Sequence, residues 1–249
     1  MLKLYARLAA RAVRLAVRGW PAGVALLLYA TVFQAASVRL ASLGPVGGFI
    51  VGFLMAFLLS SYLHLLSLAV GDRRIGLGDI RESFMARFWD VVSVLFAVWV
   101  IQLVVMSVAS AAGDRGPIIA VLVGLTMAVF FNAVPELIYL ARGQVRSFGL
   151  LMASARFITQ HWPEWLGPTV LMGAVVLAPF GLVQSGSAAE RMLRMQSLFS
   201  VDGIVLVVLA MPLWLKPIML LFITWAMMFR GLLFAALASG AARKRPLPT

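Results

Sequence analysis

Long runs of apolar residues constrain this chain more than any other feature of its sequence. Such a run must cross about 30 Å of hydrocarbon, which takes roughly 20 residues as a helix or about 10 alternating residues as a barrel strand. The clearest runs are Trp20–Val38, Val46–Val70, Val91–Ala112, Pro117–Ala141 and Trp165–Val183. They are long and do not alternate in polarity, so they predict transmembrane helices.

A sixth apolar block, Gly203–Ser239, is too long for a single span. As one helix its residues would extend about 55 Å at 1.5 Å per residue. Pro212 and the Lys216-Pro217 pair interrupt it. We therefore expect it to divide into two segments. These are a short interfacial or re-entrant piece, Ile204–Leu215, and a sixth span, Ile218–Ser239.

The composition agrees with this membrane assignment. Hydrophobic residues make up 63% of the 249 positions and charged residues 12%, against about half and a quarter in an average soluble domain. This excludes a water-soluble globular enzyme, and the apolar content excludes a disordered chain. The expected fold is an all-α polytopic membrane protein with six transmembrane helices in a single membrane domain, residues 1–249.

Basic residues are distributed unevenly between the two sides of the predicted membrane. Of the 21 Lys and Arg residues, 15 fall on one side: Lys3, Arg7, Arg11, Arg14, Arg18, Arg73, Arg74, Arg81, Arg87, Arg142, Arg146, Arg156, Arg243, Lys244 and Arg245. The opposite side carries Arg39, Arg115, Arg191 and Arg194. Because Lys and Arg mark the cytoplasmic side, both termini are expected inside. Topology thus accounts for the net charge of +12, and nucleic acid is not an expected partner.

The first 19 residues predict a separate helix. Lys3, Arg7, Arg11, Arg14 and Arg18 are spaced by four, four, three and four positions, which places them on one helical face. We expect a basic amphipathic helix in the cytoplasmic interface, held by apolar burial and by anionic lipid. Docking of this helix on a partner protein is the alternative, and the sequence does not separate the two.

The chain contains an internal repeat. Leu-Ala-x-Gly closes the second, fourth and sixth spans at residues 68–71, 140–143 and 237–240. Gly76, Phe84 and Trp89 recur 73 positions later as Gly149, Phe157 and Trp162. We therefore expect three parallel copies of an amphipathic helix followed by a helical hairpin. The copies are residues 1–71, 72–143 and 144–240; an extracytoplasmic insertion covers 184–216 and a basic tail 241–249.

This layout, with short amphipathic helices before tryptophan-led hairpins, resembles a group of uncharacterised bacterial six-span proteins. The group includes the membrane-domain type found fused to glycerophosphodiesterases. The resemblance covers most of the chain and rests on the pattern of elements. It implies a location in the bacterial inner membrane, and it carries no catalytic residues over to this chain.

Four polar residues are predicted within the spans, where polar groups are costly. They are His64, Asn132, Glu136 and Arg230, and the repeat makes His64 and Glu136 equivalent. One hypothesis is a polar cluster lining a cavity open to the cytoplasm. The other, which we favour, is a structural Glu136–Arg230 pair with hydrogen bonds between helices. Pro135 is expected to kink the fourth span and free a carbonyl near Asn132.

Aromatic and basic side chains at the span ends predict interfacial anchors, because the rings of such residues sit at the headgroup level. The expected anchors are Trp20, Trp89, Trp162, Trp214 and Lys216.

Sequence motifs of catalysis are missing. The chain has no Walker-type loop, no Rossmann fingerprint, no HExxH and no cysteine, and it has two histidines. We therefore expect no enzymatic activity, no cofactor and no metal. The expected function is a non-enzymatic scaffold or assembly partner of other membrane proteins. The alternative is a transporter subunit in which a separate cytoplasmic ATPase pushes on Leu77–Arg87 and Phe148–Gln160.

Overall fold

A computed structural model describes residues 1–140, 147–181 and 216–243, and these residues are almost wholly helical, with no strand among them. The helices are α1 (Leu2–Arg18), α2 (Trp20–Leu40), α3 (Gly44–Val70), α4 (Leu77–Ala86), α5 (Phe88–Ala111), α6 (Gly116–Phe130), α7 (Val134–Leu140), α8 (Ser147–Gly181) and α11 (Lys216–Arg243). Two short 3₁₀ turns, η1 (Ala41–Leu43) and η2 (Gly113–Arg115), close the α2–α3 and α5–α6 hairpins. The prediction of an all-helical fold is confirmed.

Four segments of the described chain are long and apolar enough to cross a membrane. They are Trp20–Val70, Phe88–Ala111, Gly113–Leu140 and Pro217–Gly240. The first contains both α2 and α3, of 21 and 27 residues. The expected fifth span begins in the second half of α8 and continues past the described residues, where the segment Ile204–Leu215 also lies.

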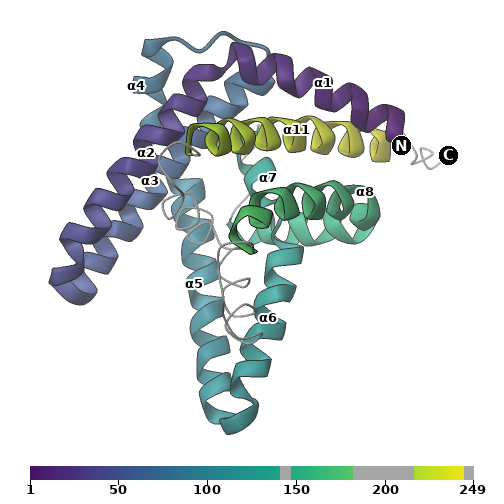
Figure 1. Cartoon of the computed structure of the whole chain (residues 1–249). Coiled ribbons are helices and arrows are strands. Elements are labelled where there is room, and N and C mark those ends of the chain that lie inside the picture. Colours follow the sequence, from purple (N-terminus) through teal and green to yellow (C-terminus); the bar gives the residue numbers. More distant parts are fainter. Residues whose placement is uncertain (141–146, 182–215, 244–249) are drawn as a thin grey trace.

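The helices are arranged as two hairpins that extend from a shared end. In Figure 1 the α2–α3 and α5–α6 hairpins point away from this end in different directions, and α1 and α11 lie across it. α11 packs along α1 and also contacts α2, α3, α7 and α8. It runs crosswise to the α5–α6 hairpin in this view.

Helices α3, α7 and α11 form the centre of the molecule, because each of them contacts the other two. Their facing side chains are almost fully excluded from solvent. The largest include Leu63, Leu65 and Leu66 of α3, Ile138 and Tyr139 of α7, and Met228 and Leu233 of α11. The last helices before the three Leu-Ala-x-Gly sequences therefore share one hydrophobic core.

The three amphipathic segments cover this centre in a cyclic order. α4 packs on α3, α1 packs on α11, and α8 packs on α5, α6, α7 and α11. α4 thus lies on the helix that precedes it in the chain, whereas the first segment lies on the last helix. The two ends of the described chain are joined by this contact, as Figure 1 shows.

The three junctions between an amphipathic segment and the following apolar helix have similar backbones. Gly19, Arg87 and His161 have φ of −89°, −130° and −132° and ψ of 22°, 15° and 27°. These values lie near the bridge region, where a helix is interrupted without a loop. An exposed tryptophan follows within two residues in each case: Trp20, Trp89 and Trp162 are 59%, 70% and 62% exposed.

The apolar face of α1 packs against the protein itself. Ala12 and Leu15 are buried, and the indole Nε1 of Trp225 in α11 donates to the carbonyl of Ala9 at 3.4 Å. The Tyr5 hydroxyl donates to the carbonyl of Glu164 at 3.1 Å. Burial and the nearby Glu164 carboxylate raise the pKa of Tyr5, so this donor stays protonated at neutral pH. Part of the apolar face of α1 is therefore covered by α11, while the contact of this helix with anionic lipid or with a partner protein stays a prediction.

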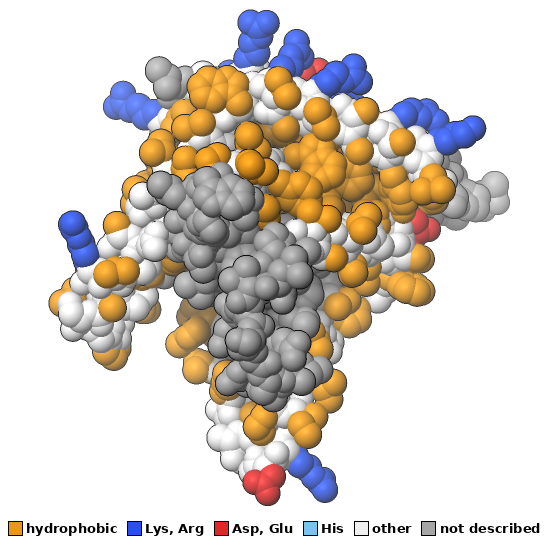
Figure 2. Space-filling model, viewed as in Figure 1, with side chains coloured by type: hydrophobic (Ala, Val, Ile, Leu, Met, Phe, Trp, Pro, Cys, Tyr) orange, Lys and Arg blue, Asp and Glu red, His pale blue; other side chains and the backbone are white. Residues whose placement is uncertain are grey.

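The basic face of α1 remains exposed along its whole length. Lys3, Arg7, Arg11, Arg14 and Arg18 all lie in the solvent-accessible part of the helix. Figure 2 shows Lys and Arg side chains standing along this edge of the molecule, beside large apolar surfaces. The spacing of the basic residues therefore predicted correctly that they lie on one face of the helix.

The contact between α7 and α11 supplies a test of the central packing. A Cβ at Gly231 would lie 2.3 Å from the hydroxyl of Tyr139, which is itself buried. We expect Gly231→Ala to lower the stability of the purified protein by about 1–3 kcal/mol through overpacking, measured by thermal unfolding in detergent.

Gly240→Ala is the matched control, because it lies in the same helix with nothing within 4 Å of the added Cβ. Tyr139→Phe should recover part of the loss when combined with Gly231→Ala. Equal melting temperatures for the two single variants would contradict this packing.

Candidate functional site

A buried ion pair links α7 to α11. Arg230 donates from Nε to one carboxylate oxygen of Glu136 at 2.7 Å and from Nη2 to the other at 3.1 Å. The Glu136 side chain is fully buried and that of Arg230 is 14% exposed. Two parallel hydrogen bonds of this kind are the strongest arrangement available to a carboxylate and a guanidinium. The structure therefore brings together two of the four polar residues predicted in the spans.

A break in the fourth predicted span places Asn132 beside this pair. α6 ends at Phe130 and α7 begins at Val134, with Pro135 in its first turn. The Val134 N–H donates to Phe131 at 3.1 Å, and Phe130 instead accepts a 2.7 Å hydrogen bond from the Ser154 hydroxyl. Non-helical backbone at membrane depth is tolerated where protein buries it. The presence of Pro135 predicts this interruption, and the carbonyl that it frees forms a hydrogen bond with α8.

The backbone at the break also receives the arginine. Arg230 Nη2 donates to the carbonyl of Asn132 in addition to its bonds with Glu136. Asn132 accepts a second hydrogen bond at its side-chain oxygen, from Trp165 Nε1 at 3.0 Å. Asn132 thus connects the ion pair to α8, so three of the four predicted residues belong to one network.

Trp165 closes the network from the side of α8. Its side chain is completely buried, and the guanidinium carbon of Arg230 lies 5.1 Å from its ring centroid. Phe157 and Phe234 pack against the same ring with centroids 5.3 and 6.1 Å away. An aromatic face is a favourable neighbour for a cation that has lost water. Sequence analysis missed this role, because Trp165 stands at the start of an apolar run and is typical of an interfacial residue.

Tyr139 holds the same two helices together one turn further along α7. Its hydroxyl donates to the carbonyl of Met227 at 3.0 Å and sits over the bare backbone of Gly231. This contact was also missed. The pattern Arg230-Gly231, in which a small residue follows a buried charge, is the signal that could have indicated a close approach here.

His64 does not join this network. It lies in α3, and among the described residues its side chain makes no hydrogen bond or ion pair with Asn132, Glu136 or Arg230. The repeat makes His64 equivalent to Glu136 in sequence, yet only Glu136 belongs to the network.

A second buried polar cluster joins α2, α3 and α4. The Ser61 hydroxyl lies 2.7 Å from the Tyr29 hydroxyl and 2.5 Å from the Ser83 hydroxyl. The Arg87 N–H donates to Ser60 at 3.1 Å, at the junction between α4 and α5. These contacts attach an amphipathic helix to the core, as Ser154 does for α8.

The remaining predicted residues lie at the periphery or outside the described chain. Trp20, Trp89 and Trp162 are exposed at the junctions. Lys216 is the first residue of α11, and Trp214 lies outside the described residues. Arg18 pairs with Asp72 at 2.9 Å, while the rest of the basic face of α1 carries no ion pair among the described residues.

The arrangement around Glu136 and Arg230 is a sealed one. Both carboxylate oxygens accept from Arg230, which also contacts Asn132 and Trp165 and is 14% exposed. Within residues 1–140, 147–181 and 216–243, no three His, Asp or Glu side chains gather in a way that could hold a metal ion. The geometry suits a structural lock between α7, α8 and α11.

Comparisons with known proteins give no family for this chain: no family model, no curated protein and no solved structure matches it.

The ion pair predicts a distinctive pattern of stability changes. We expect Glu136→Gln or Arg230→Gln alone to cost about 3–5 kcal/mol, because each leaves a buried partner uncompensated. The double variant Glu136→Leu/Arg230→Met should recover most of this loss, since it buries no charge. Thermal unfolding in detergent and the amount of protein in the membrane fraction measure the effect.

Arg156→Gln serves as the control, because this arginine of α8 takes part in none of these bonds. Single variants as stable as Arg156→Gln would show that the pair contributes nothing.

Proposed function

We propose that this protein is a non-enzymatic integral membrane subunit that acts as a scaffold or assembly partner for other membrane proteins. The observation that carries the proposal is the sealed Glu136–Arg230 pair. Its three hydrogen bonds are all made to groups of the same chain, and the Glu136 carboxylate is fully buried. A charge used in this way fixes the positions of helices and leaves no free acid or base for chemistry or for an ion path.

The α5–α6 hairpin offers the surface for such a role. Only 11% of the residues in the most apolar part of α5 are buried, whereas 50% are buried in the corresponding part of α11. Its exposed large side chains include Phe96, Trp99, Leu103, Met106 and Leu122. Figure 1 shows this hairpin extending away from the centre of the molecule. In a membrane its sides are open to lipid and to the helices of other proteins.

The topology proposed here has six spans, with both termini in the cytoplasm of a bacterial inner membrane. It is supported by the clustering of Lys and Arg around α1 and α4. The cyclic packing of α1, α4 and α8 on α11, α3 and α7, with three similar junctions, supports three parallel repeats of one module. Anionic lipid is the proposed partner of the exposed basic face of α1.

A transporter subunit driven by a separate ATPase is the second candidate, and α4 favours it. Phe84 of α4 stacks on Phe57 of α3 with centroids 5.0 Å apart, so a push on α4 would reach a central helix. Arg81 and Glu82 are exposed on its outer side. A short, firmly attached helix with an exposed charged face is the form that a coupling element needs.

The proposed topology predicts which positions react from outside the cell. The chain has no cysteine, so single-cysteine variants give unambiguous labelling with a membrane-impermeant maleimide. Ser42→Cys in η1 and Asp114→Cys in η2 should react in intact cells. Lys3→Cys and Gly78→Cys should react after permeabilisation only.

The direction of α11 is tested in the same way. Six spans place Ile218→Cys outside and Ser239→Cys inside, at opposite ends of the helix. Labelling of both from the cytoplasmic side would show that α11 lies along the interface, and the six-span topology would be wrong.

The scaffold proposal predicts that other membrane proteins co-purify in a fixed ratio. Extraction in a mild detergent followed by quantitative mass spectrometry measures this. Gly48→Leu/Gly52→Leu should reduce the recovery several-fold without changing the melting temperature, because both glycines of α3 have open space around an added Cβ and small residues allow helices from another chain to approach closely.

Gly78→Leu is the control outside the predicted spans, with similar open space. A stoichiometric ATPase among the recovered proteins would favour the transporter candidate. Recovery of this chain alone would contradict both.

A further inference from the structure

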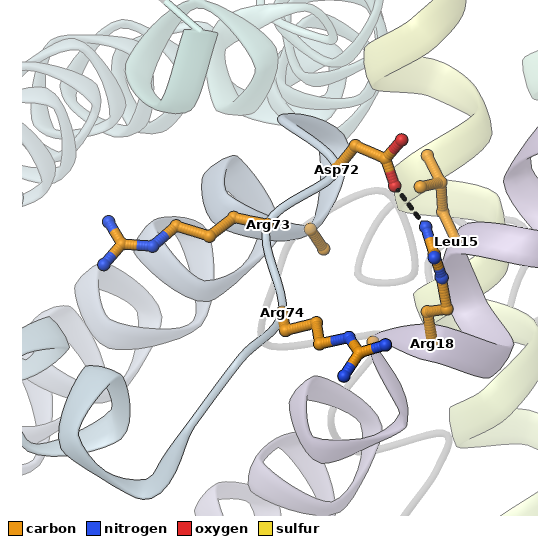
Figure 3. Close-up of a pocket in the computed structure, with 7 residues that line it drawn as sticks. Leu15, Arg18, Asp72, Arg73 and Arg74 are labelled. Carbon is orange, nitrogen blue, oxygen red and sulfur yellow. Dashed lines mark hydrogen bonds and ion pairs between the residues drawn. The ribbon is translucent and has the colours of Figure 1, made fainter.

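A small cleft of about 10 Å³ lies where α1 and α3 end side by side. Arg18 and Gly19 line it from the end of α1, Ala69 from the end of α3, and Asp72 and Arg74 from the turn that follows (Figure 3). It therefore lies at the junction between the amphipathic helix and the first span, next to Trp20.

The turn that forms one wall of the cleft is held in an unusual conformation. Asp72 has a positive φ of 61°, a value that favours glycine. Its N–H donates to Ala69 and the Arg73 N–H donates to Leu68, both at 3.1 Å, which is the hydrogen-bonding pattern of a helix end that usually carries glycine. The Asp72 carboxylate accepts from Arg18 Nη1 at 2.9 Å and so fixes this guanidinium at the edge of the cleft.

Arg74 approaches the same cleft from the opposite side. In Figure 3 its side chain extends toward the end of α1, while that of Arg73, which also lines the cleft, extends in the opposite direction. Arg73 lies 3.8 Å from Asp79, whereas Arg74 has no ion pair among the described residues. Arg18 and Arg74 therefore line the cleft together with one carboxylate, that of Asp72, which pairs with Arg18. The net charge of these side chains is positive, and the basic face of α1 continues the positively charged surface.

An exposed apolar stripe begins directly after the cleft. Trp20, Val24, Leu28 and Val32 repeat every four residues on one face of α2 and are 59%, 44%, 58% and 50% exposed. The stripe runs from the cleft along an apolar helix that is long enough to cross a membrane. A ligand with an anionic head and long apolar chains matches both features, whereas inorganic phosphate matches the cleft alone.

We propose that the surface at the mouth of this cleft binds the phosphate group of an anionic phospholipid, with Arg18 and Arg74 as its ligands and the acyl chains along the stripe of α2. The guanidinium group presents donors in a planar fork that fits phosphate oxygens. The site rests on the proposed membrane location of α2, and it adds a defined position to the diffuse attraction between α1 and anionic lipid. It would fix the α1–α2 junction at the headgroup level.

Native mass spectrometry of the full chain in a neutral detergent tests this site, with phosphatidylglycerol as the probe. We expect phosphatidylglycerol to bind at least tenfold more tightly than phosphatidylcholine with the same acyl chains. Arg74→Gln should weaken its binding about tenfold, whereas Arg81→Gln, which removes an exposed arginine seven residues further on, should change it less than twofold. Arg74→Lys should keep an intermediate affinity.

Equal losses for Arg74→Gln and Arg81→Gln would overturn the proposal in favour of non-specific attraction. Displacement of phosphatidylglycerol by an equal concentration of inorganic phosphate would assign the cleft to a free anion instead. Arg74 makes no ion pair that folding needs, so the variant should keep its melting temperature. The lipid result is independent of partner recovery, because neither Gly48 nor Gly52 lines the cleft.

Discussion

The structure depends on one buried carboxylate. Glu136 has no exposed surface, and burying an unpaired charge away from water costs several kcal/mol. The cost is offset when Arg230 meets both carboxylate oxygens and when the arginine itself is covered. That requirement brings α11 against α7 and Trp165 against both, so the three helices have little freedom to rearrange.

Local features that are unfavourable alone become useful around this pair. The interruption at residues 131–133 leaves carbonyl groups without the backbone hydrogen bonds of a continuous helix. The side chains of Ser154 and Arg230 donate hydrogen bonds to these carbonyl groups instead. Gly231 weakens a helix by about 1 kcal/mol relative to alanine, yet it allows the Tyr139 hydroxyl to reach the carbonyl of Met227. The positive φ of Asp72 is maintained beside an ion pair that ties two helix ends together.

The packing of the amphipathic segments implies an order in which the helix contacts can form. α4 packs on α3, which precedes it in the chain, whereas α1 and part of the α8 surface pack against α11, the last described helix. The entropic cost of bringing α1 and α11 together grows slowly with the length of chain between them. The contacts that Leu15 and Trp225 make between the two helices offset this cost. The first and last thirds of the protein are therefore interdependent, and truncation at either end would expose an apolar face at the other.

The sequence by itself determined the apolar helices, the face that carries the basic residues, and the interruption at Pro135, because each follows from local periodicity or from the chemistry of a single residue. It also supplied Glu136 and Arg230 as a possible pair, since two opposite charges within apolar helices must be compensated.

The other partners of these two residues could not be predicted from the sequence. Trp165 has the composition of an interfacial residue, His64 stands in a position equivalent to Glu136, and the apolar face of α1 fits lipid as well as protein. Only the tertiary structure decided that Trp165 covers the arginine, that His64 stays outside the network of Glu136, and that α11 packs on α1. Hydropathy fixes which face of a helix avoids water, whereas the crossing of helices far apart in the chain decides which surface meets that face.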